Sequence, residues 1–129
     1  MIAVDSSVWI DYFNGRATPQ TDRLHEALGE QPIVIGDLVL TEVLQGFRSE
    51  QAFGRAYRLL RVFPVVSMFG PTLAVRAARN YRALRAAGVT VRKTVDVMIG
   101  TYCIERKLPL LYSDRDFDPM VDHLGLKTA

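Results

Sequence analysis

"IAVDSSVWIDYF", residues 2–13, sets a short apolar run directly against an aspartate and then begins a second apolar run. Ile2–Val4 has the length and composition of a buried strand, and Ser6 or Ser7 can cap a helix that follows it. Asp5, between the two, is either a helix cap itself or one wall of a functional site. Taken alone, an aspartate at this place is more often a cap.

The rest of the chain alternates between apolar strands and helices. Further strands are predicted at 32–37, 65–68 and 108–114, with a last short strand near Leu126. Helices are predicted over 18–28, 37–47, 50–63, 71–87 and 94–107, with a short one from Asp118. Strands that are apolar throughout and separated by helices are typical of a parallel sheet covered on both faces. We therefore expect one α/β domain over residues 1–129, an α/β/α sandwich with a central, mainly parallel sheet.

Composition narrows the class of protein. Cys103 is the only cysteine and lies far in sequence from both His25 and His123, which argues against a disulfide framework, a zinc site and a Cys-His nucleophile. No secretory signal precedes the first strand, and no apolar run approaches the roughly 18–20 residues that span a bilayer. We expect a cytoplasmic protein without a membrane partner, in which Cys103 is a buried apolar residue rather than a reactive thiol.

Charge is distributed unevenly along the chain. Residues 48–93 carry ten basic side chains and one acid, a local charge of +9, whereas the remainder carries −7 and the whole chain +2. Four arginines recur at every third position of one predicted helix, at Arg76, Arg79, Arg82 and Arg85. A basic region beside an acidic one suits a protein that attracts a polyanion and holds cations elsewhere. Solvated arginine-rich helices are the alternative interpretation.

Four acids, with a fifth close behind one of them, can meet at one edge of the predicted sheet. Asp5 and Asp114 follow strands, Asp116 comes two residues later, Asp96 lies in the first turn of a helix, and Glu42 lies beside the apolar stripe of another. Each alone could be a cap, a turn residue or a solvated surface acid. Ligands bind beyond the carboxyl ends of the strands in open α/β sheets, and oxygen ligands without His or Cys favour Mg²⁺ or Mn²⁺. As a set, the acids therefore predict a divalent metal site.

Four segments resemble the acidic motifs of a known family. They are "IAVDSSVWIDYF" (2–13), "TEVLQGF" (41–47), "TVDVMIGTYC" (94–103) and "LLYSDRDFD" (110–118). In order and spacing they are similar to the motifs of PIN-domain ribonucleases, and within that family to the VapC-type toxins of bacterial toxin–antitoxin pairs. The resemblance covers nearly the whole chain. It implies a quartet of Asp5, Glu42, Asp96 and Asp114, with Asp116 as an auxiliary acid.

The resemblance also implies a function. The expected protein is an endoribonuclease toxin that cuts a structured RNA of the tRNA or rRNA type. Its Mg²⁺, which Mn²⁺ could replace, would be held by Asp5, Asp96 and Asp114 and would activate water. A VapB-like antitoxin would neutralise it, docking between the predicted helices 37–47 and 50–63 with a basic residue near the acids. A homodimer and a toxin–antitoxin hetero-oligomer are expected.

Two alternatives remain open at this point. A phosphatase could use Asp5 as its nucleophile, although Ser7 stands where that chemistry usually has a second acid. A catalytically inactive module of the same fold could bind RNA or protein without turnover. The role of Ser113 is undecided, because the family often has threonine, asparagine or another polar residue there.

Overall fold

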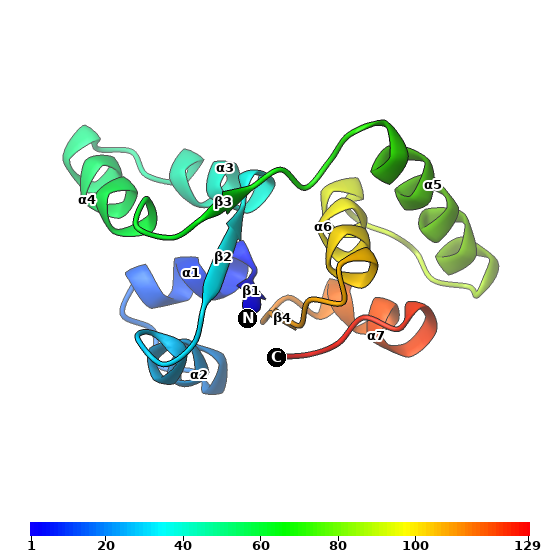
Figure 1. Cartoon of the computed structure of the whole chain (residues 1–129), viewed down its shortest axis with the longest axis horizontal. Coiled ribbons are helices and arrows are strands. Elements are labelled where there is room, and N and C mark those ends of the chain that lie inside the picture. The colour runs from blue at the N-terminus through cyan, green and yellow to red at the C-terminus, as the bar shows by residue number, and fades with distance from the viewer.

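A four-stranded parallel sheet forms the centre of the chain in the computed structural model, which describes residues 1–129 (Figure 1). Its strands are β1 (Ile2–Val4), β2 (Ile33–Gly36), β3 (Val65–Val66) and β4 (Leu110–Leu111). They lie in the order β3-β2-β1-β4, with β1 paired to both β2 and β4. Because every pairing is parallel, all four carboxyl ends lie at the same edge of the sheet.

Helices cover the sheet on both sides. They are α1 (Ser6–Phe13), α2 (Pro19–Ala27), α3 (Asp37–Gln45), α4 (Glu50–Leu60), α5 (Pro71–Ala86), α6 (Thr94–Glu105) and α7 (Asp118–Leu124), with a 3-10 turn η1 (Arg115–Phe117). Figure 1 shows α1, α2 and α4 to one side of the strands, and α5, α6 and α7 to the other. This confirms the predicted α/β/α sandwich. None of the helices is both long and apolar enough to cross a bilayer.

Some predicted elements are shorter or absent. The strands expected at 65–68 and 108–114 contain two paired residues each, and a single bridge between Leu110 and Thr128 replaces the strand expected near Leu126. An apolar run predicts burial, but a strand also needs neighbouring backbone groups to pair with, which the local sequence does not reveal. The helices expected over 37–47 and 50–63 end two and three residues earlier, at Gln45 and Leu60.

The core lies on both faces of the sheet. Trp9, Leu24, Ile35 and Ile99 are fully buried, and all residues of β1, β2 and β4 are buried with them. Cys103 is 1% exposed, and burial raises the pKa of its thiol to about 12. The expected burial of Cys103 is therefore confirmed, and the raised pKa favours the neutral thiol.

Candidate active site

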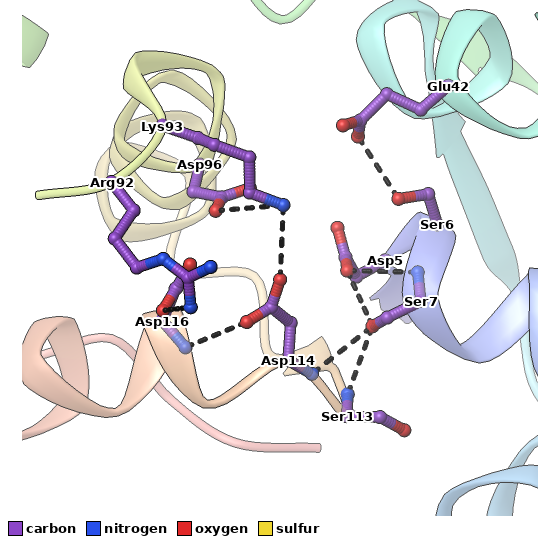
Figure 2. Close-up of polar contacts among 10 residues, drawn as sticks. All are labelled: Asp5, Ser6, Ser7, Glu42, Arg92, Lys93, Asp96, Ser113, Asp114 and Asp116. Carbon is purple, nitrogen blue, oxygen red and sulfur yellow. Dashed lines mark hydrogen bonds and ion pairs between the residues drawn. The ribbon is translucent and has the colours of Figure 1, made fainter.

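Acidic side chains from four parts of the chain approach one another at the carboxyl edge of the sheet. Asp5 directly follows β1, Asp114 lies in the connection after β4, Asp96 lies in the first turn of α6, and Glu42 lies on α3. Figure 2 shows Asp5, Asp96 and Asp114 around a common space, with Glu42 at its rim on the α3 side. Parallel strands with helical crossovers place these positions together although they are far apart in sequence.

Three of the acids are close enough to share one cation. Carboxylate oxygens of Asp96, Asp114 and Asp116 lie within 4.8 Å of one another. Asp5 faces the same space from β1 but is not part of this triplet. The expected metal ligands were Asp5, Asp96 and Asp114, so the structure adds Asp116 to the near group and places Asp5 slightly apart from it.

Asp5 combines a structural role with a free oxygen. Its Oδ2 accepts hydrogen bonds from the backbone N–H of Ser7 at 3.1 Å and from the Ser7 Oγ at 2.6 Å. Asp5 is therefore the N-cap of α1, which confirms one of the two interpretations of this residue, and the expectation that Ser6 or Ser7 caps the helix is wrong. The reason is that Asp5 has the extended backbone of a cap residue, with φ −72° and ψ 158°. Its Oδ1 is buried and has no hydrogen-bond partner.

Ser7 joins the loop after β1 to the loop after β4. Its Oγ donates to Asp5 and accepts from the backbone N–H groups of Ser113, at 3.1 Å, and Asp114, at 3.4 Å. One hydroxyl thus sets the separation of two acidic loops (Figure 2). Sequence reasoning missed this role because it considered Ser7 as a cap, and as the residue in place of a second phosphatase acid, but not as a link between loops. The signal that could have found it is a hydroxyl residue two positions after a strand-end acid.

Ser6 makes a second link, to α3. Its Oγ donates to Glu42 Oε1 at 3.1 Å and so turns this half-buried side chain toward the site. Burial raises the pKa of Glu42, and the negative charge of Asp5 raises it further, while the bond from Ser6 works in the opposite direction. Glu42 is therefore not the fully solvated surface glutamate that its place beside an apolar stripe could have indicated.

Burial also makes the aspartates hard to ionise. It raises the pKa of Asp96 to about 7; the ammonium of Lys93 opposes the shift, and the charges of Asp5 and Asp114 add to it. The pKa of Asp5 is raised as well, mainly by burial, although its bonds from Ser7 lower it in part. Carboxylates held in this way gain from a nearby cation, because the cation stabilises their charged forms.

The donor set fits a hard divalent cation. Asp5 Oδ1, Asp96 Oδ2 and Ser113 Oγ are buried without a hydrogen-bond partner, which is uncommon for polar atoms in folded proteins. The first two are carboxylate oxygens beside the common space, whereas Figure 2 draws the Ser113 side chain pointing away from the acids. Carboxylate oxygens, with no His or Cys among them, are the ligands that Mg²⁺ and Mn²⁺ prefer.

Two basic residues also enter the site. Lys93 Nζ lies 3.3 Å from Asp114 Oδ2 and 3.8 Å from Asp96 Oδ2, and Arg92 pairs with Asp116 at 3.7 Å. Burial lowers the pKa of Lys93, but the charges of Asp96, Asp114 and Glu42 outweigh it, so that the pKa is raised overall. Sequence reasoning assigned both residues to the basic middle segment and did not place them beside the acids.

Comparison with known proteins agrees with the geometry. The sequence model of one family, described as the PIN domain, matches residues 2–121. The chain belongs to the PIN domain family. This PIN domain is 28% identical over 131 aligned positions to "Ribonuclease VapC11" of Mycobacterium tuberculosis, covering 100% of this chain and 98% of the relative. The resemblance expected from the four acidic motifs is thereby confirmed.

Solved structures share the fold of this PIN domain. VapBC2 from Rickettsia felis, bound to a DNA fragment from its promoter, superposes with a TM-score of 0.79 at 13% identity, covering 100% of this chain and 98% of that one. VapC20 of Mycobacterium tuberculosis, described as a "Sarcin-Ricin loop cleaving toxin", superposes with a TM-score of 0.68 at 18% identity, covering 92% and 93%. At these identities the likeness shows the architecture.

Proposed function

We propose that this PIN domain is a metal-dependent endoribonuclease toxin of the VapC type. One observation carries the proposal: acids from separate elements converge, and two of them, Asp5 and Asp96, keep a buried oxygen that has no hydrogen-bond partner in the chain. A divalent cation would give these oxygens a partner. PIN domain nucleases generally use such a metal, and Mg²⁺, with Mn²⁺ as a substitute, suits the oxygen ligands.

The acidic residues would have separate roles in the reaction. Asp5, Asp96 and Asp114 would hold the metal, with Asp116 supporting Asp114 through a backbone N–H that donates to Asp114 Oδ1 at 2.9 Å. Glu42, turned inward by Ser6, would orient water or accept its proton. When bound, the metal supplies a polarised phosphodiester and an activated water for in-line attack. A raised pKa makes Glu42 better suited to accept a proton near neutral pH.

The substrate that we propose is a structured RNA of the tRNA or rRNA type. Support comes from the name of VapC20, which is a sarcin-ricin loop cleaving toxin, and from exposed arginines on α5, the helix that packs against α6. Arg76 pairs with Glu105 and Arg85 lies over Tyr81, whereas Arg79 and Arg82 are exposed on the same helix. The last two are the better candidates for phosphate contacts.

A VapB-like antitoxin is the proposed regulatory partner. Four of the solved structures with this fold are described as VapBC or as a toxin–antitoxin complex. Among the large apolar residues of segments 37–47 and 50–63, Leu60 is buried, and Phe47 and Phe63 pack on the core. Phe53 and Tyr57 on α4 remain 37% and 44% exposed, and offer an antitoxin segment an apolar surface. We also propose a homodimer, a hetero-oligomer with the antitoxin and a cytoplasmic location.

Purified protein incubated with total RNA tests the function. We expect cuts at discrete positions that require Mg²⁺ or Mn²⁺, mapped by sequencing the new ends, and no cuts with Asp5→Asn or Asp96→Asn. Binding of RNA without any cleavage at either metal would support the inactive binding module instead. Replacing Arg79 and Arg82 should weaken RNA binding broadly and reduce its salt dependence, with Arg76 and Arg85 replaced together as the matched control.

A further inference from the structure

Lys93 is the one cation that contacts two carboxylates of the acidic site. Its Nζ lies between Asp114 Oδ2 and Asp96 Oδ2, at 3.3 Å and 3.8 Å, and Figure 2 shows it reaching into the space that the acids surround. Asp96 and Asp114 both belong to the triplet of acids whose carboxylate oxygens approach within 4.8 Å of one another. The ammonium thus lies where a cation shared by these carboxylates would be held.

The local fold delivers Lys93 to this place. It is the residue before α6, with extended backbone at φ −135° and ψ 122°, and Asp96 follows three positions later in the first turn of that helix. The polar contacts of its ammonium are those with Asp114 and Asp96. The side chain is 51% exposed, and lysine has a long flexible stem, so the ammonium can move from the acids into water.

We propose that Lys93 is a built-in competitor of the metal: its ammonium neutralises Asp96 and Asp114 until a divalent cation displaces it. This inference rests on the metal site of the proposed function and goes beyond it by assigning a residue that lowers metal affinity. An ammonium and a divalent cation cannot occupy the same ligand oxygens, because each would repel the other at contact distance. The competitor keeps the carboxylates in place without metal and makes loading dependent on metal concentration.

Arg92 provides the contrast. It is adjacent in sequence and carries the same charge, but it is 75% exposed and meets only Asp116, at 3.7 Å. If Lys93 acted only through general electrostatics, removal of either charge should change metal affinity by a similar factor. Direct occupation of the ligand oxygens predicts a much larger effect at Lys93 than at Arg92.

Titration of the full chain with Mn²⁺, followed by the electron paramagnetic resonance signal of the free ion, tests the proposal. Lys93→Met should bind Mn²⁺ about tenfold more tightly than the wild type, and Arg92→Met should gain less than about threefold. Lys93→Arg, which keeps the charge, should stay within about threefold of the wild type. Lys93→Gln replaces Lys93→Met if circular dichroism shows that the latter is not folded.

The outcomes separate this inference from the function on which it rests. Equal Mn²⁺ affinities of Lys93→Met and Arg92→Met, or no gain in affinity in Lys93→Met, would overturn the proposal that Lys93 competes with the metal. The metal site itself would still stand if Mn²⁺ binding by the wild type depends on Asp96. If the wild type binds Mn²⁺ no better than Asp96→Asn, both the proposed metal site and the competing role of Lys93 are overturned. Weaker RNA binding by Lys93→Met at unchanged Mn²⁺ affinity would make Lys93 a phosphate ligand and would also overturn the proposal.

Discussion

Asp5 and Asp37 occupy equivalent places in the sheet, but their carboxylates have different surroundings. Each directly follows a strand, β1 or β2, at the same carboxyl edge, and each stands at the start of a helix. Asp37 Oδ1 accepts from the N–H of Leu38 at 2.8 Å and from that of Met68 at 3.0 Å, which ties the end of β2 to the segment after β3. Asp5 also accepts its bonds through one oxygen, Oδ2, but its other oxygen, Oδ1, is buried as well as unpaired.

The order of the strands explains the difference. β2 and β3 lie on one side of β1 and β4 lies on the other, so the chain changes direction across the sheet between β1 and β4. The crevice of an open α/β sheet forms at this switch point. Asp5 and Asp114 stand on its two sides, whereas Asp37 stands at the end of β2, where it holds neighbouring segments together. What marks Asp5 as a site residue is therefore an unpaired oxygen that is also buried at this crevice.

The largest expected effect lies at Asp5. Asp5→Asn should reduce the rate of RNA cleavage by about a thousandfold or more, because a metal ligand loses its charge. The amide oxygen can still cap α1, and a buried charge is removed, so the melting temperature should stay the same or rise. Cleavage assays at saturating Mg²⁺ and thermal melts check both parts. Cleavage at the wild-type rate would contradict the assignment of Asp5 to the site.

Asp37 should show the opposite pattern. Asp37→Ala leaves the N–H groups of Leu38 and Met68 without their acceptor, and the free energy of unfolding should fall by about 2–3 kcal/mol. Cleavage per folded molecule should stay within about threefold of the wild type. Denaturant melts measure the loss, and Asp37→Asn, which keeps the acceptor oxygen, is the matched control. A thousandfold loss of activity in folded Asp37→Ala would erase the contrast with Asp5.

Ser7 tests how Asp5 is held. Ser7→Ala removes the bond to Asp5 and the acceptor for the N–H groups of Ser113 and Asp114, and cleavage should fall by about 10–100-fold. Ser7→Thr keeps the hydroxyl and should restore most of the activity. If the alanine variant binds Mn²⁺ and cleaves RNA like the wild type, the hydroxyl does not set the separation of the two loops.

The smallest effect concerns the pH dependence of stability. The pKa of Asp96 is about 7 in the folded chain against an ordinary value of 3.8, so folding favours its neutral form. Its contribution to stability is therefore complete below about pH 4 and is lost as the pH rises through about 7. With EDTA present, the melting temperature of Asp96→Asn should exceed that of the wild type by a margin that widens from pH 5 to pH 8. A constant margin would contradict the raised pKa.

The sequence by itself determined the elements, the layers and the acids. Apolar strands separated by helices required a covered parallel sheet, and acids at strand ends and helix starts had to meet at its carboxyl edge, because both follow from local pattern and chain connectivity. Asp5, Glu42, Asp96 and Asp114 could be named from the sequence for this reason, whereas Asp116 was named only through the resemblance to the family.

Only the tertiary structure decided how each oxygen is used. Asp5 caps α1 with one oxygen and leaves the other without a partner, and Asp37 accepts a hydrogen bond from the N–H of Met68. The Lys93 ammonium lies between Asp96 and Asp114. These relations depend on side-chain directions and on backbone groups that are distant in sequence, such as the N–H of Met68, 31 residues from Asp37. No local pattern encodes them, because a carboxylate at a strand end looks the same in sequence whether its oxygens are satisfied or free.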